Sequence, residues 1–267
     1  MADSVYISKN LSTEQLRFMK LMDEYELLYF NMQEVEETMN TSFSNLNEVL
    51  ENLVDKKVLR RLEKEKYARL DFSDIHPLAS FISQGGVIGY WSALHIHGLT
   101  ERFPNKIFVK IAHRKRNTTL MGIPIQFVSV QERKLSKGVI KQGYGDRSFT
   151  LTTPEATLLD CFDQPRYAGD FPDLLRAFAK ATLDNEQLIE YAKMLNNRAV
   201  IKRLGYIAEL VRPQDLGTFI EFAHSMVNKK YDLFEASGEE EGAFNNRWKI
   251  RLNLSEDDIL NIIKSSY

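Results

Sequence analysis

The sequence predicts an α+β protein with two domains, and three observations support this prediction. The 267 residues, 43% of them hydrophobic, can fill one large core or two ordinary ones. Residues 1–74 show three stretches with helical apolar spacing followed by a charged hairpin pattern. Residues 75–267 mix strand and helix patterns and end in a mainly helical half. We therefore expect a small N-terminal domain over 1–74 and a larger mixed α/β domain over 75–267.

The net charge of −2 conceals an uneven distribution along the chain. Residues 1–55 carry 3 Lys/Arg against 11 Asp/Glu, whereas residues 56–69 carry 7 Lys/Arg against 2 Asp/Glu. A nucleic-acid surface requires a local concentration of positive charge, which an acidic protein can also have. Residues 56–69 are therefore the first candidate for such a surface.

The composition indicates a cytoplasmic protein without a membrane partner. The single cysteine, Cys161, permits no internal disulfide. No apolar run approaches the length of a membrane span. The first residues, Met1 to Ser4, lack the basic and apolar regions of a secretory signal.

Three helices are predicted in the N-terminal domain. Ser12 to Gln15 have the form of a capping box, which opens a helix that should run to about Tyr25. Residues 27–30 form an apolar link too short to assign as strand or turn. A second short helix is expected over 32–39 and a third over 46–54, where leucines and valines follow one stripe.

A hairpin is predicted after the third helix. Two β-prone runs within residues 57–70 flank a charged turn at 63–66. Three helices followed by a hairpin is the order of a winged helix-turn-helix, in which the third helix enters the major groove and the wing touches the backbone. Candidate DNA contacts near the start of the third helix are Thr41, Ser42, Ser44, Asn45 and Asn47, and candidates on the wing are Lys57, Arg60, Arg61, Lys64 and Lys66.

A structural interpretation of the same residues stays open. Ser42 and Ser44 can simply cap a helix, and the basic residues can form a solvated hairpin. Winged helices also serve as protein-interaction modules that never touch DNA.

The second domain is expected to begin near His76-Pro77, because proline disfavours helix in the preceding residue. Gly98 should end a helix in the left-handed conformation, which glycine enters at little cost. Helices are predicted over 78–83, 89–97, 153–162, 170–181, 184–195, 198–211, 216–226 and after Ser255, and strands over 107–111, 123–130, 148–151 and 247–253.

A basic tetrad follows the strand at 107–111. It consists of His113 and the three cations Arg114, Lys115 and Arg116. These cations can provide a second phosphate contact, or they can form an ordinary solvated loop.

No catalytic residue, metal site or cofactor is expected. The sequence has no glycine-rich phosphate loop. His95 and His97 point roughly 200° apart on a helix and cannot share a metal ion. Cys161 lies among apolar residues, which indicates a buried structural thiol. Asp160 and Asp163 share a helix face and are expected to be solvated or paired with a cation such as Arg166.

Five blocks of sequence carry a resemblance to a known family. They are Tyr90-Trp91-Ser92-Ala93-Leu94-His95-Ile96-His97-Gly98-Leu99-Thr100-Glu101, Ile107-Phe108-Val109, Thr153-Pro154-Glu155-Ala156-Thr157-Leu158-Leu159-Asp160-Cys161, Asn197-Arg198-Ala199-Val200-Ile201-Lys202-Arg203-Leu204-Gly205-Tyr206 and Asn246-Arg247-Trp248-Lys249-Ile250-Arg251-Leu252-Asn253. In this order they resemble the AbiEi family, the antitoxin and transcriptional regulator of type IV toxin–antitoxin systems. The resemblance extends over about residues 10–255.

The resemblance implies a function for each domain. The winged helix would bind inverted repeats in the promoter of its own operon, as double-stranded DNA, and repress transcription. The C-terminal domain would act as the antitoxin and assist repression. The functional partner would be a nucleotidyltransferase-like toxin encoded next door, opposed without a stable complex. Because residues 1–55 are acidic, DNA affinity would depend on the wing and the third helix.

Two other functions stay open at this point. The first is a winged-helix module that binds proteins. The second is a metal-dependent nucleic-acid enzyme in residues 75–267, which would need clustered carboxylates. The acidic residues that offer any such cluster are Asp160, Asp163, Asp170 and Asp173.

Overall fold

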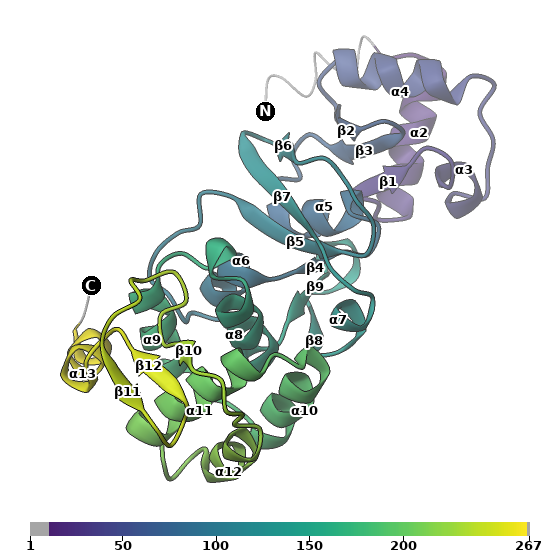
Figure 1. The fold of residues 1–267 in the computed structure, drawn as a ribbon. Coiled ribbons are helices and arrows are strands. Elements are labelled where there is room, and N and C mark those ends of the chain that lie inside the picture. The colour runs from purple at the N-terminus through teal and green to yellow at the C-terminus, as the bar shows by residue number, and fades with distance from the viewer. Residues whose placement is uncertain (1–10, 266–267) are drawn as a thin grey trace. The chain divides into compact units, whose positions relative to one another are not determined.

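The computed structural model describes residues 11–265 and separates them into two compact units (Figure 1). Unit 1 comprises residues 11–84 together with 120–122 and 143–148, and unit 2 comprises the remaining residues. Both units combine helices with β-sheets, which confirms the predicted α+β class. Residues 75–82, assigned from the sequence to the second domain, form a helix that belongs to unit 1.

Unit 1 places a small antiparallel sheet among its helices. The strands lie in the order β1-β3-β2, so β3 is the central strand. The elements in chain order are α2 (Thr13–Glu24), β1 (Tyr29–Asn31), α3 (Val35–Thr38), α4 (Leu46–Asp55), β2 (Leu59–Glu63), β3 (Lys66–Arg69) and α5 (Ile75–Ile82).

The local signals for these elements are confirmed. Ser12 and Gln15 form the predicted capping box, since each side chain accepts the backbone N–H of the other residue. The predicted hairpin is the antiparallel pair β2–β3, with Leu59 opposite Arg69. Residues 27–30, which the sequence left open, contribute Tyr29 and Phe30 to β1 through pairing with β3.

One core holds α2, α4 and the hairpin together. Phe18 of α2 packs edge-on against Phe30, with ring centroids 5.4 Å apart. Phe30 in turn stacks on Tyr67 of the hairpin at 5.7 Å. Leu50 and Leu53 of α4 are fully buried in the same cluster. Burial of this apolar surface fixes α4 and the β2–β3 hairpin relative to each other.

Unit 2 contains a six-stranded mixed sheet in the order β6-β7-β5-β4-β9-β8. The pairs β5–β7 and β4–β9 are parallel, whereas β4–β5 and β8–β9 are antiparallel. The strands are β4 (Val87–Ile88), β5 (Ile107–Ile111), β6 (Thr118–Leu120), β7 (Ile123–Ser129), β8 (Val139–Gln142) and β9 (Phe149–Thr152). The strands β5, β7 and β9 were predicted from the sequence, and β4, β6 and β8 were not.

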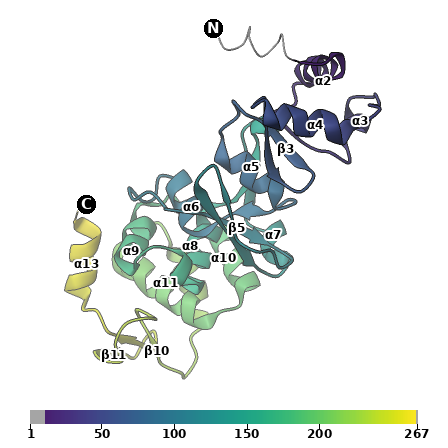
Figure 2. The same ribbon diagram turned by 90° about the horizontal axis from the view of Figure 1, so that it is seen from above.

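The helical half of unit 2 surrounds α8, which contacts α6, α9, α10 and α11 (Figure 2). Thr153, Asp170 and Asp184, the residues at which the predicted helices begin, cap the starts of α8, α9 and α10 with their side chains. The helices are α6 (Tyr90–Ile96), α7 (Arg133–Ser136), α8 (Pro154–Asp163), α9 (Phe171–Lys180), α10 (Asn185–Leu195), α11 (Arg198–Val211), α12 (Gly217–Ser225) and α13 (Glu256–Lys264), with short 3-10 turns at η1 (Gly145–Arg147) and η2 (Pro165–Tyr167).

Two glycines frame α6, the helix in the strongest block of the family resemblance. Gly98 ends the helix with φ at 67°, the left-handed conformation that the sequence predicts. Gly89 precedes the helix, where a Cβ atom would lie 2.8 Å from Cδ of Lys110. The left-handed backbone at Gly98 and the close approach of the Lys110 side chain at Gly89 each favour a residue without a side chain.

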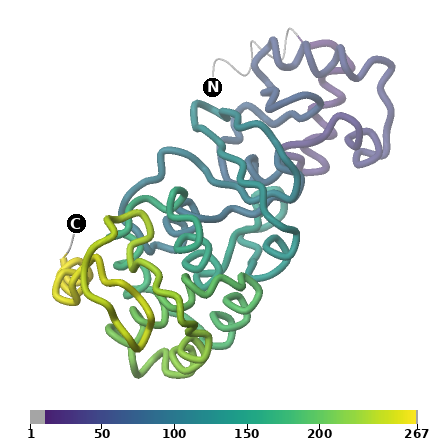
Figure 3. Tube along the Cα trace, viewed as in Figure 1, coloured from purple at the N-terminus to yellow at the C-terminus, as the bar shows by residue number. Residues whose placement is uncertain are grey.

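The chain ends in a second, smaller sheet and a helix, which the yellow trace of Figure 3 follows. The strand order is β10-β12-β11, for β10 (Asp232–Leu233), β11 (Ala243–Asn245) and β12 (Ile250–Leu252). The strand predicted over 247–253 is thus shortened to β12, and β11 was not predicted from the sequence. Ser255 caps α13 in a capping box, as expected for the last helix.

Two acidic residues of α8, Asp160 and Asp163, were expected to be solvated or paired with a cation. Asp160 is fully buried, and its Oδ2 accepts hydrogen bonds from Nζ of Lys110 at 2.6 Å and from the Tyr191 hydroxyl at 3.0 Å. Asp163 instead accepts hydrogen bonds from Lys134 at 3.1 Å and from Asn197 at 2.8 Å. Both carboxylates are thus paired with a cation, which is one of the two expected environments, but the cations are Lys110 and Lys134 and not Arg166.

The Cys161 thiol is fully buried, as predicted. Burial raises the pKa of this thiol well above its usual value, which keeps it protonated. Within the described part of the chain, no helix is long and apolar enough to cross a membrane.

Candidate nucleic-acid interface

The start of α4 is organised by side chains that were predicted to contact DNA. Asn45 is the N-cap of α4: its Oδ1 accepts the N–H of Glu48 at 3.3 Å, and its Nδ2 donates to the Glu48 carboxylate at 2.8 Å. Ser44 and Asn47 are exposed on either side of it. The structure therefore gives Asn45 a capping role and leaves Ser44 and Asn47 facing solvent.

Arg17 of α2 holds the loop before α4. Its Nη2 donates to the Thr41 hydroxyl at 2.5 Å, and its Nη1 donates to the Ser42 carbonyl at 3.4 Å. The guanidinium also lies over the Phe43 ring, 5.1 Å from the centroid. Sequence reasoning missed Arg17, because no local spacing links α2 to a loop 24 residues away.

Replacing Asn45 by alanine is expected to destabilise the protein by about 1 kcal/mol, because the N–H of Glu48 loses its cap. Asn45→Ser, which keeps a capping oxygen and adds no negative charge beside Glu48, should restore most of that loss. Urea unfolding at pH 7 measures both changes. Equal stability of Asn45→Ala and the parent protein would contradict the capping role.

The cations of the β2–β3 hairpin differ in their exposure and in their hydrogen bonds. Lys64 lies in the turn with its side chain 90% exposed. Nη2 of Arg60 donates to the Leu70 carbonyl at 2.7 Å. Nη2 of Arg61 donates to Glu51 at 2.6 Å and to the Tyr67 hydroxyl at 3.0 Å.

These contacts keep Arg61 charged and Tyr67 neutral. The hydrogen bond with Tyr67 raises the pKa of Arg61, and the nearby Glu51 carboxylate acts in the same direction. Burial raises the pKa of Tyr67, as does its hydrogen bond to Glu51. The guanidinium of Arg61 is therefore held in place on α4 while it remains half-exposed.

Lys66 does not contribute to the exposed basic surface that the sequence predicted. Its side chain is only 8% exposed, and Nζ pairs with Glu63 at 2.8 Å. The same ammonium donates to the carbonyls of Ile82 at 3.2 Å and Phe81 at 3.4 Å. Because β3 is the central strand and Lys66 bonds the end of α5, the residue is buried and cannot reach a phosphate.

The exposed face of α4 is acidic. Glu48, Glu51 and Asp55 follow one another at helical spacing on this face, and among residues 11–265 only Glu51 has a cation, Arg61, against it. Positive charge in unit 1 is therefore concentrated on the hairpin, and the polar uncharged groups lie at the N-terminal end of α4.

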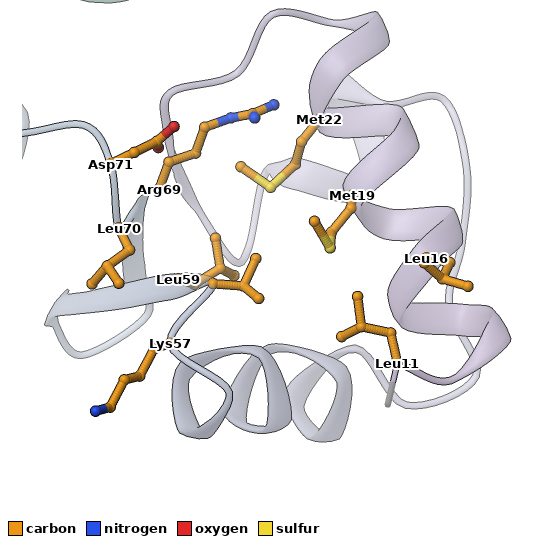
Figure 4. A pocket seen from close by; sticks show the side chains of 10 residues that line it. Leu11, Leu16, Met19, Met22, Lys57, Leu59, Arg69, Leu70 and Asp71 are labelled. Carbon is orange, nitrogen blue, oxygen red and sulfur yellow. The ribbon is translucent and has the colours of Figure 1, made fainter. Parts of the chain in front are cut away.

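An apolar groove of about 540 Å³ lies between α2 and the base of the hairpin (Figure 4). Its walls include Leu16, Met19 and Leu59, with Leu70 at the hairpin end. Figure 4 shows the ammonium of Lys57 pointing away from these apolar side chains. Lys57 is thus available to solvent as an exposed cation.

In unit 2, the three cations of the predicted tetrad line a cavity of about 490 Å³. They are Arg114, Lys115 and Arg116, in the loop between β5 and β6. The ammonium of Lys115 lies over the Phe127 ring, 5.3 Å from its centroid. The loop therefore forms part of a concave basic wall.

The acidic residues considered for an enzymatic site have cationic partners. Asp170 and Asp173 both pair with Arg102, and Asp173 also pairs with Arg176. Asp160 and Asp163 bond Lys110 and Lys134 as described above. Over residues 11–265, no three His, Cys, Asp or Glu side chains gather as a metal-binding group.

Comparison with known proteins yields a likeness in fold. No family model matches this chain, and no curated protein does so either. Among solved structures, the RV2827C protein from Mycobacterium tuberculosis has a similar fold, with a TM-score of 0.65 and 14% sequence identity. The match covers 96% of each chain. At this identity the likeness concerns the fold alone, and it extends over nearly the whole chain.

Proposed function

We propose that this protein is a DNA-binding transcriptional repressor in which unit 1 acts as a winged helix-turn-helix. The observation that carries this proposal is the element order α2-β1-α3-α4-β2-β3 around an antiparallel sheet, with cations on the final hairpin. In winged helices the third helix enters the major groove and the hairpin lies against the backbone. The corresponding elements here are α4 and β2–β3.

The expected DNA contacts follow from the exposure and the hydrogen bonds of each side chain. Ser44 and Asn47 are exposed polar groups that can reach base edges. Lys57, Arg60, Arg61 and Lys64 would bind phosphates. Thr41, Ser42 and Asn45 would support the start of α4 through their contacts with Arg17 and Glu48.

The resemblance to the AbiEi family supports a more specific form of the proposal. In this form the protein binds inverted repeats in its own promoter, in the cytoplasm, and has no catalytic activity. It also serves as the antitoxin of a neighbouring nucleotidyltransferase-like toxin without a stable complex. The basic hairpin favours DNA as the partner, and the likeness in fold to RV2827C adds no functional information.

The test is a titration of the purified protein with its own promoter fragment and with a scrambled fragment of equal length. We expect tighter binding to the promoter fragment and a steep loss of affinity between roughly 50 and 200 mM salt, because several phosphate contacts release counterions. Equal weak binding to both fragments would contradict a repressor function.

A second candidate function is a winged-helix module that binds a basic protein. The acidic face formed by Glu48, Glu51 and Asp55 specifically favours it, since negative charge on the third helix repels a duplex. In that case the scrambled and promoter fragments would bind equally weakly. Copurification of a basic partner that is lost on replacing Glu48 and Asp55 would then support the module.

A further inference from the structure

A polar cavity of about 510 Å³ lies in unit 2 at the carboxyl end of β7. Its lining includes Ser129 at the end of β7, Arg133 and Lys134 of α7, and Arg166 and Tyr167 after α8. Because β5 and β7 are parallel, their carboxyl ends meet at one edge of the sheet, where open α/β sheets bind ligands. The volume lies in the range of small-molecule sites, about 300 to 1,000 Å³.

The lining of this polar cavity is cationic. Arg133, Lys134 and Arg166 contribute to it, and no Asp or Glu side chain of the described residues does. Lys134 is 15% exposed, pairs with Asp163 at 3.1 Å and lies 3.8 Å from Oδ1 of Asp160, so its charge is partly compensated. Arg133 and Arg166 are exposed and supply the uncompensated charge.

A second group of cations adjoins the polar cavity. Phe127 and Ser129 line both this cavity and the one formed by Arg114, Lys115 and Arg116. None of the residues between 11 and 265 that line the second cavity is acidic either. Six Lys and Arg side chains thus flank the end of β7, and their combined potential attracts a ligand that carries several negative charges.

A flat surface for stacking lies in the wall of the same cavity. The guanidinium of Arg166 lies over the Tyr167 ring, 4.7 Å from its centroid. Packing against Tyr90 and Phe108, with centroid distances of 5.1 and 5.7 Å, fixes the Tyr167 ring. Aromatic rings and guanidinium planes are the groups on which nucleic-acid bases stack.

We propose that the polar cavity binds a nucleoside polyphosphate. The base stacks on the Arg166–Tyr167 pair, and the phosphates bind Arg133 and extend past Ser129 toward Arg114 and Arg116. The planar guanidinium of Arg166 favours a ligand that contains a base. The second group of cations favours several linked phosphates over a single phosphate. This site uses no residue of unit 1 and does not depend on DNA binding.

Calorimetric titration of the full chain with ATP, inorganic tripolyphosphate and adenosine tests the proposal. We expect ATP to bind most tightly, tripolyphosphate more weakly and adenosine weakest. Arg133→Ala should weaken ATP and tripolyphosphate alike, by about tenfold. Arg166→Ala should weaken ATP by about tenfold with a smaller effect on tripolyphosphate, because it removes the stacking surface.

Two further variants make the result specific. Arg166→Lys keeps the charge without the guanidinium plane and should not restore ATP affinity. Arg198→Ala removes an exposed cation of α11 that lines neither cavity, and it should bind ATP as the parent protein does. Thermal unfolding of every variant checks that the fold is retained.

Three results would overturn the proposal. ATP could bind no more tightly than tripolyphosphate, which would show that the site does not recognise the nucleoside. Arg133→Ala and Arg166→Ala could bind ATP as tightly as Arg198→Ala does. A random duplex of about 16 base pairs could displace ATP and depend on Arg133, which would make these cations a nucleic-acid contact.

Discussion

Replacing Arg60 and Arg61 together by alanine is expected to weaken promoter binding by about 30-fold, at about 1 kcal/mol for each lost phosphate contact. The loss should be the same for promoter and scrambled fragments, because phosphate contacts carry no sequence information. The slope of log affinity against log salt concentration should also become shallower, by the amount expected for about two lost phosphate contacts. Electrophoretic mobility shifts at several salt concentrations measure all three effects.

The structure explains why these two arginines should matter most. Both are held by their contacts to Leu70 and Glu51, so little side-chain entropy is lost when they bind a phosphate. Glu51 keeps the Tyr67 hydroxyl as a partner, at 2.9 Å, when Arg61 is removed. The double variant should therefore fold normally.

Two single variants test whether the lost affinity comes from contacts of the hairpin or from the change in net charge. Lys20→Ala removes an exposed cation of α2 and should leave affinity nearly unchanged. Glu48→Gln removes a negative charge at the start of α4 and retains an oxygen that can accept the Asn45 hydrogen bond. If α4 faces the duplex, this change should tighten binding to every fragment. Unchanged affinity in both Glu48→Gln and the arginine variant would contradict the proposed orientation and favour the protein-interaction module.

Elements with strong local signals could be predicted from the sequence, whereas elements that depend on distant partners could not. The helices α8 and α13 begin at the predicted caps, Thr153 and Ser255, because capping is settled within four residues. The strand β4 has only two residues, Val87 and Ile88, and exists because β5 and β9 lie on either side of it. Its sequence carries no period that could reveal it.

The candidate sites show the same difference between residues with a local signal and residues that depend on distant partners. The cations Arg114 to Arg116 are adjacent in the sequence and were found by composition. Arg133 and Arg166 come from separate segments, so their shared cavity is visible only in the fold. Lys66 was predicted wrongly because its environment depends on a separate segment. Its position on the hairpin suggests a phosphate contact, but α5, which follows the hairpin in the sequence, packs against it and buries it.

Asp160→Ala is expected to cause the largest loss of stability, about 3 to 5 kcal/mol, because it leaves the fully buried ammonium of Lys110 without its carboxylate. Replacing all three members of the network, as Lys110→Met, Asp160→Leu and Tyr191→Phe, should cost less than the single change. Urea unfolding at pH 7 compares the two variants. A triple variant as unstable as Asp160→Ala would show that lost packing, and not an unpaired charge, causes the deficit.

The deficit of Asp160→Ala should also depend on pH in a defined direction. Burial lowers the pKa of Lys110 below its usual value of 10.5, and the Asp160 carboxylate opposes this shift. Without Asp160 the pKa of the folded state falls further, whereas that of the unfolded state does not change. The unfolded state then binds more protons, so the stability of the variant rises as the pH rises from the folded pKa toward 10.5. The parent protein should show a smaller rise from this group over the same range, and equal pH profiles would contradict a charge interaction between Asp160 and Lys110.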